Sequence, residues 1–245
     1  MIESTSDLLG LDISRLGLDE AVAVCRARIK HQRGGYACFV NAHTATLAIE
    51  DSSVRAALND ATFRFADGMP LLWLAKLKRT PVTTRVAGPD FMRCMLESEP
   101  RITHGFIGGE PGRGEAIARR FGVHAVSYSP PMREFSEANA LEDWRKLTAS
   151  CADGCPPAIV WVGLGAPKQE RWAHAIAARA PQTMFFAVGA AFEFLSGNIA
   201  RAPAVMQRNG LEWAYRLAIE PRRLWRRYLS TNTRFVALAI RDLWR

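Results

Sequence analysis

The stretch Val160–Glu170, which reads VWVGLGAPKQE, decides the fold class of this chain. An apolar run typical of a buried strand passes into a turn bounded by Gly163 and Gly165, and Pro167 then begins a helical pattern. The same order of apolar run, turn and helical pattern recurs along the chain from Tyr36 onward. Short strands that alternate with helices are typical of an α/β fold with a mainly parallel sheet.

The periodicity predicts a Rossmann-like α/β sheet with helices on both faces, followed by a helical appendage. We place the α/β domain at residues 1–200 and the Arg-rich appendage at residues 201–245. The predicted strands are Tyr36–Val40, Thr62–Ala66, Ile102–Ile107, Val123–Tyr128, Ala158–Val162 and Thr183–Val188. The predicted helices are Asp19–Lys30, His43–Asn59, Pro70–Lys78, Pro89–Glu97, Arg113–Phe121, Ala138–Ser150, Pro167–Arg179 and a region from Pro203 past Arg216.

The composition is that of an ordinary globular protein. The 245 residues are 49% hydrophobic and 23% charged, which is enough for a large core. Glu3, Asp7 and Asp12 interrupt the N-terminus, and no apolar run approaches the roughly 20 residues that span a bilayer. We therefore expect a cytoplasmic protein, or one that lies peripherally on the cytoplasmic, inner face of the plasma membrane.

Basic charge is concentrated at the C-terminus. The chain has a net charge of +8, and from Arg201 onward ten arginines stand against three acidic residues. These arginines are interleaved with Trp213, Tyr215, Trp225 and Tyr228. Such asymmetry indicates a phosphate-rich partner, which on charge alone is a nucleic acid, an anionic membrane or a pyrophosphate group. The alternative is a solvated basic face.

The sequence predicts neither a zinc site nor a nicotinamide cofactor. The five cysteines include one close pair, Cys151 and Cys155, with no second pair and no nearby His, which is atypical of zinc sites. The turn at Gly163–Gly165 lacks the third glycine of the dinucleotide-binding fingerprint.

Several candidate site residues follow predicted strands directly. Asn41, Asp67, Gly108–Gly109, Gly163–Gly165 and Gly189 each come at or just after the carboxyl end of a strand. Ligands of open α/β sheets bind outside this edge, so we expect these positions to converge on one site. Glycines there let backbone N–H groups approach an anion, and a helix N-terminus adds a favourable dipole.

Each polar candidate also has a purely structural explanation. Asp67 stands in an Asp-Gly-Met-Pro sequence, which is common in turns and helix N-caps. Asn41 and Thr44 fit a helix cap as well. Arg85 fits a surface salt bridge.

Four stretches together resemble the WecG/TagA/CpsF family of bacterial glycosyltransferases. The resemblance implies an inverting, metal-independent enzyme without a cofactor, which moves a sugar from a UDP-sugar to a polyprenyl-pyrophosphate-linked saccharide in surface polysaccharide biosynthesis. The sugar is then a hexose, N-acetylmannosamine or its uronic acid. No D-x-D carboxylate pair occurs, which agrees with a reaction that needs no divalent metal. The four stretches are Asn41–Leu74, Val160–Glu170, Ala187–Ala204 and Gly210–Leu229.

The resemblance also assigns roles to individual residues. Asp67 is the general base that deprotonates the acceptor hydroxyl. Arg216, Arg223 and Arg226 hold the acceptor diphosphate, on an appendage that covers the site and contacts an anionic membrane. The remaining substrate-binding residues are Asn41, Thr44, Arg85, Gly108, Gly109, Gly163, Gly165, Gln169 and Glu170.

Two other classes of protein are alternatives. A basic nucleic-acid-binding protein would use the C-terminus, although none of the usual readout motifs is present. A soluble sugar-nucleotide oxidoreductase would use the same sheet edge with a nicotinamide. If the protein is a glycosyltransferase, we expect no nucleic acid as partner. The sequence does not decide the oligomeric state, and a homo-oligomer is one of the open alternatives.

Overall fold

A six-stranded parallel sheet forms the centre of the protein in a computed structural model. The structure describes residues 4–152 and 154–244, except the side chains of residues 204, 208, 223, 224 and 226–229. The strand order is β4-β3-β8-β7-β5-β6, and every neighbouring pair is parallel. The predicted α/β fold class and all six predicted strands are confirmed. The strands are β3 (Gly35–Val40), β4 (Phe63–Ala66), β5 (His104–Gly108), β6 (Ala125–Tyr128), β7 (Ile159–Gly163) and β8 (Met184–Ala187).

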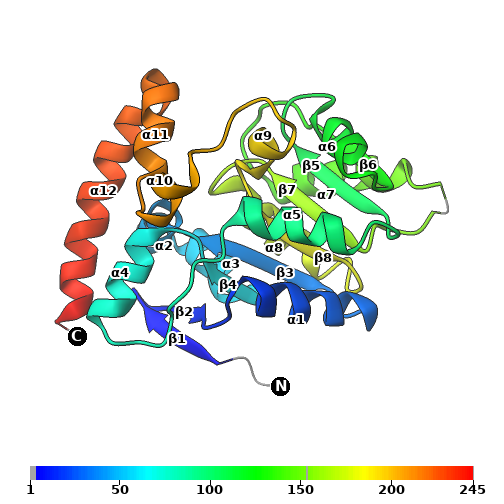
Figure 1. Ribbon diagram of the computed structural model, residues 1–245. Helices are drawn as coiled ribbons and strands as arrows, with labels where there is room; N and C mark the ends of the chain where they lie inside the picture. The colour runs from blue at the N-terminus through cyan, green and yellow to red at the C-terminus, as the bar shows by residue number, and fades with distance from the viewer. Residues whose placement is uncertain (1–3, 153, 245) are drawn as a thin grey trace.

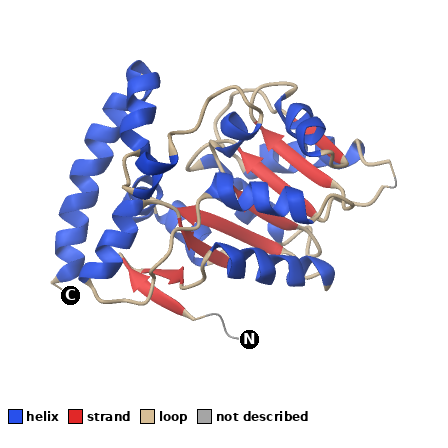
Figure 2. Cartoon of the chain, in the orientation of Figure 1, coloured by secondary structure: helices blue, strands red, loops and turns tan. Residues whose placement is uncertain are grey.

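Side chains alternate between two hydrophobic clusters along each central strand. On β3, Tyr36, Cys38 and Val40 face one cluster, while Ala37 and Phe39 face the other. Both faces are apolar because helices cover both, which is why the strands read as continuous hydrophobic runs. Figure 2 shows these helices in front of and behind the sheet.

Nine helices of the described residues before residue 201 flank the sheet. The cluster that contains Val40 receives α2 (Ala42–Glu50), α3 (Ser52–Asn59), α4 (Met69–Leu77), α7 (Glu137–Ala149) and α8 (Lys168–Ala177). The cluster that contains Phe39 receives α1 (Leu18–Lys30), α5 (Gly88–Ser98), α6 (Arg113–Phe121) and α9 (Ala191–Leu195).

The structure corrects the predicted helix His43–Asn59, which is two helices. Asp51 is extended, with φ −131° and ψ 112°, so α2 ends there. Its carboxylate accepts hydrogen bonds from the backbone N–H groups of Ser53 and Val54 and thereby caps α3. An aspartate cap inside an amphipathic run is hard to distinguish from a helical residue by periodicity alone.

An N-terminal hairpin, β1 (Thr5–Leu8) and β2 (Leu11–Ser14), was not among the predicted strands. Its turn residues Leu9 and Gly10 have φ values of 60° and 73°. A positive φ is expected for glycine but uncommon for leucine, so the usual hairpin signal is weak here.

Three helices follow residue 201: α10 (Ala204–Arg208), α11 (Glu212–Ile219) and α12 (Pro221–Leu243). Pro221 occupies the first turn of α12, directly after the break that ends α11 at Ile219. Figure 1 shows α11 and α12 standing beside the sheet, next to α2 and α4. Within the described residues, no helix is long and apolar enough to cross a membrane.

The long helix α12 shares the core of the sheet domain. Phe235 is 5% exposed and belongs to the same cluster as Leu74 of α4. Asp242 accepts hydrogen bonds from the backbone N–H of Leu9 at 3.1 Å and from Lys78 Nζ at 2.7 Å. These contacts hold α12 to the hairpin and to α4, and the boundary at residue 200 stays a prediction.

Candidate active site

A cavity of about 940 Å³ opens at the carboxyl edge of the sheet. Residues that follow β3, β4, β7 and β8 form its floor, and α4, α11 and α12 form its walls. Open α/β sheets bind ligands at this edge. The predicted site residues that line the cavity are Asn41, Thr44, Asp67, Arg85, Gly163, Gly165, Gln169 and Arg216.

The loops after β3 and β4 place Asn41 and Asp67 side by side. The backbone N–H of Asp67 donates to the carbonyl of Val40 at 2.7 Å, which extends the strand pairing by one residue. Gly68 has a φ of 154°, and a Cβ there would lie 3.4 Å from the Cβ of Asn41. A side chain at position 68 would therefore strain the backbone and press on Asn41.

Asn41 and Thr44 form the N-terminal cap of α2. Asn41 Oδ1 accepts from the backbone N–H groups of His43 at 3.0 Å and Thr44 at 3.2 Å. Thr44 Oγ1 accepts from the N–H of Asn41 at 2.9 Å, which completes a capping box. The capping explanation therefore holds for both residues, and both also line the cavity.

Asp67 is the titratable group at the floor of the cavity. Burial raises the pKa of Asp67 to about 6, and nearby Glu212 adds to the rise. Arg85, the backbone N–H of Gly88 and Arg201 oppose this rise. A carboxylate with such a pKa is ionised at neutral pH and is a stronger base than an ordinary aspartate.

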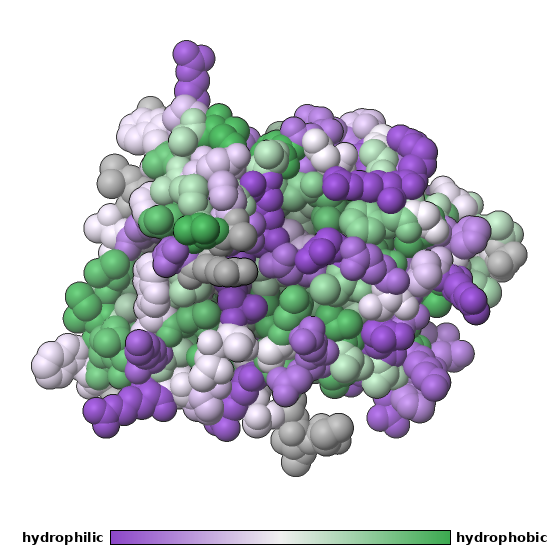
Figure 3. All heavy atoms as spheres, in the orientation of Figure 1, coloured by the Kyte–Doolittle hydropathy of each residue, from purple (hydrophilic) through white to green (hydrophobic). Residues whose placement is uncertain are grey.

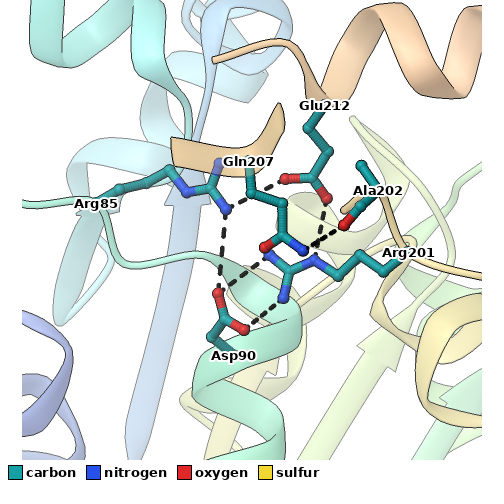
Figure 4. Close-up of polar contacts among 6 residues, drawn as sticks. All are labelled: Arg85, Asp90, Arg201, Ala202, Gln207 and Glu212. Atoms are coloured by element: carbon teal, nitrogen blue, oxygen red, sulfur yellow. Dashed lines mark hydrogen bonds and ion pairs between the residues drawn. The ribbon is translucent and has the colours of Figure 1, made fainter. Parts of the chain in front are cut away.

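Two arginines and two carboxylates form a closed network (Figure 4), and three of these charges, Arg85, Arg201 and Glu212, act on the pKa of Asp67. Arg85 Nη2 lies 3.2 Å from Glu212 Oε2 and 4.0 Å from Asp90 Oδ2. Arg201 pairs with the same two acids, with its Nη2 at 3.0 Å from Asp90 Oδ2 and its Nε at 3.1 Å from Glu212 Oε1. The network ties α11 to α5 and to the loop that follows α9.

Arg216 lies one turn after Glu212 on α11 and also lines the cavity. Its guanidinium carbon lies 5.4 Å from the ring centre of Phe194, and Nη2 lies 4.0 Å from Glu220 Oε2. Attachment of α11 through Glu212 therefore places Arg216 in the wall of the cavity that holds Asp67. The side chains of Arg223 and Arg226 lie outside the described residues.

Gln169 faces the cavity, whereas Glu170 does not. Gln169 Nε2 donates to Glu170 Oε1 at 2.9 Å and to the carbonyl of Ala187 at 3.0 Å. Its buried Oε1 has no hydrogen-bond partner among the described residues, so a donor group of a ligand would satisfy it. Successive helix residues point about 100° apart, so Glu170 faces the core, where burial raises its pKa to about 7. The expected ligand contact of Glu170 is thus replaced by a contact that orients Gln169.

Gly108 and Gly109 also do not line the cavity. The N–H of Gly109 donates to the carbonyl of Gly163 at 3.2 Å, and a Cβ at Gly109 would lie 3.0 Å from the ring of Phe192. The aromatic ring on α9 covers this strand end. These glycines therefore allow close packing rather than direct contact with the cavity, in contrast to the expected role.

The sequence profile of the glycosyl transferase WecG/TagA/CpsF family matches residues 6–245. The chain belongs to this family. It is therefore a glycosyltransferase, as the sequence resemblance predicted.

Two curated bacterial relatives support the assignment of this glycosyltransferase. Both are named N-acetylglucosaminyldiphosphoundecaprenol N-acetyl-beta-D-mannosaminyltransferase. The protein of Bacillus spizizenii (strain W23) is 29% identical over 209 residues, which cover 82% of this chain and 77% of the relative. The protein of Bacillus subtilis (strain 168) is 29% identical over 206 residues, which cover 82% and 78%.

Sequence reasoning missed several residues that line the glycosyltransferase cavity or pair with its arginines. Asp90, Arg201 and Glu212 were not predicted, because their pairs join positions up to 127 residues apart and no local spacing signals them. Glu193 also lines the cavity and forms an ion pair with the buried Arg113. Across the part of the chain that the structure describes, no group of three or more His, Cys, Asp or Glu residues could hold a metal ion.

The network around Glu212 predicts a measurable effect on stability. Glu212→Gln removes the charge shared by Arg85 and Arg201, whose side chains are only 16% and 19% exposed. We expect the free energy of unfolding to fall by about 1–3 kcal/mol, measured by urea denaturation.

The matched control is Glu50→Gln, which breaks an exposed ion pair with Arg234 on α12. An exposed pair contributes little, so this change should stay within about 0.5 kcal/mol. Equal losses in the two variants would contradict a special role of the network.

Proposed function

We propose that this glycosyltransferase transfers a sugar from a UDP-sugar to a saccharide carried on a polyprenyl diphosphate, with inversion at the transferred carbon. The observation that carries the proposal is Asp67, a carboxylate with a raised pKa in a cavity shared with Arg85, Arg201 and Arg216. The printed names of both relatives support a diphosphate-linked polyprenol acceptor. The product would enter a surface polysaccharide.

The reaction requires one base and a stabilised leaving group. An acceptor hydroxyl attacks the anomeric carbon of the donor and passes its proton to the Asp67 carboxylate. The bond from this carbon to the diphosphate oxygen breaks, and UDP departs with the bonding electrons. Attack opposite to the leaving group inverts the configuration, as expected for a mechanism with a single carboxylate base.

The arrangement of the cavity divides it between donor and acceptor. Gln169, with its unpaired Oε1, and the Gly163–Gly165 turn line the same cavity as Asn41, and we place the donor at these residues. Arg216 of α11 also lines the cavity, beside Phe194 of α9, and we place the acceptor diphosphate at this arginine together with Arg223 and Arg226. The transferred sugar would be a hexose, N-acetylmannosamine or its uronic acid.

The basic helices would also bring the enzyme to its lipid-linked substrate. Trp213, Ile219 and Trp225 are each between 41% and 48% exposed on α11 and α12, near the exposed Arg222. Aromatic and basic side chains together favour an anionic membrane surface. We therefore propose a peripheral position on the inner face of the plasma membrane.

The most informative assay screens UDP-sugars for UDP release with a polyprenyl-diphosphate-linked N-acetylglucosamine acceptor. The proposal expects release that depends on both substrates. UDP release that is unchanged without the acceptor would mean hydrolysis and would contradict the proposed transfer.

We also propose that the reaction needs no divalent metal, because Arg85, Arg201 and Arg216 line the cavity and their charges would neutralise the leaving diphosphate. Excess EDTA is therefore expected to leave the initial rate of transfer unchanged within about twofold. Loss of activity on chelation, restored by Mg²⁺ or Mn²⁺, would contradict this part of the proposal.

A further inference from the structure

The catalytic cavity continues away from Asp67 as a groove between α4 and α12. On α4, positions 69, 70, 73, 74 and 77 line it, and on α12 positions 235, 236, 239, 240 and 243 do so. Both sets repeat at helical spacing, so each helix gives one continuous face to the groove. The α12 face from Thr231 to Leu243 is about 18 Å long at the rise of an α-helix.

The groove has a buried floor and exposed apolar walls. Leu74 and Phe235 are only 2% and 5% exposed at its floor. The large apolar side chains of the walls are between 41% and 66% exposed, and the view in Figure 3 shows hydrophobic surface over α4 and α12. The wall residues are Trp73, Leu77, Val236, Ile240 and Leu243. A contiguous apolar surface of this kind marks a binding site in a protein that is otherwise well packed.

The inner end of the groove is continuous with the polar part of the cavity. Gly210, with a φ of 73°, precedes α11, and a Cβ there would lie 2.9 Å from Met69 and 3.0 Å from Trp73. This close packing brings the residue before α11 directly against α4. Arg216 and the groove residues line one continuous cavity. The surface suits a ligand with an anionic head and a long apolar tail.

We infer that this groove binds the first isoprene units of the acceptor's polyprenyl chain, while the diphosphate lies at Arg216. The inference rests on the proposed function and adds a lipid subsite to it. Bilayer acyl chains are the competing occupant. The shape of the groove favours one polyprenyl chain over bilayer acyl chains. Its floor is buried between two helices, and it is continuous with the cavity that holds Asp67.

The test uses soluble acceptors without any membrane. N-acetylglucosamine diphosphate esters that carry either a farnesyl chain or a methyl group are compared below their micelle concentrations. The wild-type enzyme is expected to have a KM at least tenfold lower for the farnesyl acceptor. The double variant Leu77→Gln/Ile240→Gln alters two exposed wall residues and should fold normally. It is expected to raise the farnesyl KM about tenfold and to leave the methyl kinetics within twofold.

The matched control is Met132→Gln, because Met132 is 99% exposed and lies outside the cavity. It should change neither KM. A double variant with unchanged farnesyl KM but weaker binding to anionic liposomes would show that the bilayer contacts this face, and would overturn the inference. Equal impairment with both acceptors would overturn it as well.

A binding measurement separates this inference from the proposed function. Calorimetric titration with farnesyl diphosphate requires no transfer reaction. Tight binding to the wild type, weakened about tenfold in the double variant, supports the lipid groove even if neither acceptor is glycosylated. Equal affinity of the two proteins, or of farnesyl diphosphate and inorganic diphosphate, would refute it.

Discussion

Asp67→Asn is expected to lower turnover by about 100-fold or more, because the amide keeps the shape of the side chain but cannot accept the acceptor proton. The KM for the UDP-sugar should change little, since other groups of the cavity bind the donor. Initial rates of UDP release at saturating acceptor measure the effect. Turnover close to that of the wild type would mean that Asp67 has a structural role in its turn and that another group is the base.

The same variant carries its own control for folding. The folded-state pKa of Asp67, about 6, lies above the ordinary value of 3.8, so ionisation of this carboxyl opposes folding. This cost is absent below pH 3.8 and complete above pH 6. Asp67→Asn removes it and should therefore raise the free energy of unfolding at pH 7.5 by about 1–2 kcal/mol, after allowance for solvent in the cavity. A less active but more stable protein excludes unfolding as the cause of lost turnover.

Arg216→Ala is expected to lower kcat/KM for the acceptor by about 100-fold, because a charged ligand of the diphosphate is lost from the cavity. Arg216→Lys should recover part of this loss, since it keeps the charge but not the planar fork that grips two oxygens. The exposed Arg234, which pairs with Glu50, provides the control Arg234→Ala, with little expected change. Equal kinetics of the two alanine variants would remove Arg216 from the acceptor site.

Point substitutions separate the role of the C-terminal arginines from the stability of the fold, whereas truncation of the C-terminal helices does not. Phe235 fills the core beside Leu74, and Asp242 bonds to Leu9 and Lys78. Removal of the chain from residue 204 onward would expose this core and leave polar groups of the hairpin without partners. Loss of activity in such a fragment would follow from unfolding as readily as from loss of the arginines.

The sheet could be predicted from the sequence because each strand is a short apolar run between turn residues. Helices cover both faces, so β3 and β8 are apolar without interruption, and this signal is strong. The break at Asp51 and the hairpin turn at Leu9 depend on single residues whose local conformation departs from the pattern of their neighbours. The hydrophobic periodicity of the sequence does not reveal such positions.

From the residues alone the site could be predicted where they follow strands directly, and the resemblance supplied further cavity residues such as Arg85 and Arg216. Asn41 and Asp67 could be placed because the carboxyl ends of parallel strands share an edge. Gly109 follows the same rule but is covered by Phe192, and Glu170, which the resemblance supplied, is turned toward the core; both outcomes depend on the packing of α8 and α9. The pairing of arginines with Asp90 and Glu212 depends on tertiary contacts across the chain, which spacing does not encode.

The pH dependence of kcat/KM for sugar transfer tests the central claim, that Asp67 is the base, most directly. Because burial raises the pKa of Asp67 to about 6, transfer by the wild type should rise tenfold per pH unit below pH 6 and level off above it. The residual activity of Asp67→Asn should lack this break. A rate that is independent of pH between about 5 and 8, or a break near pH 6 that persists in Asp67→Asn, would contradict the proposed mechanism.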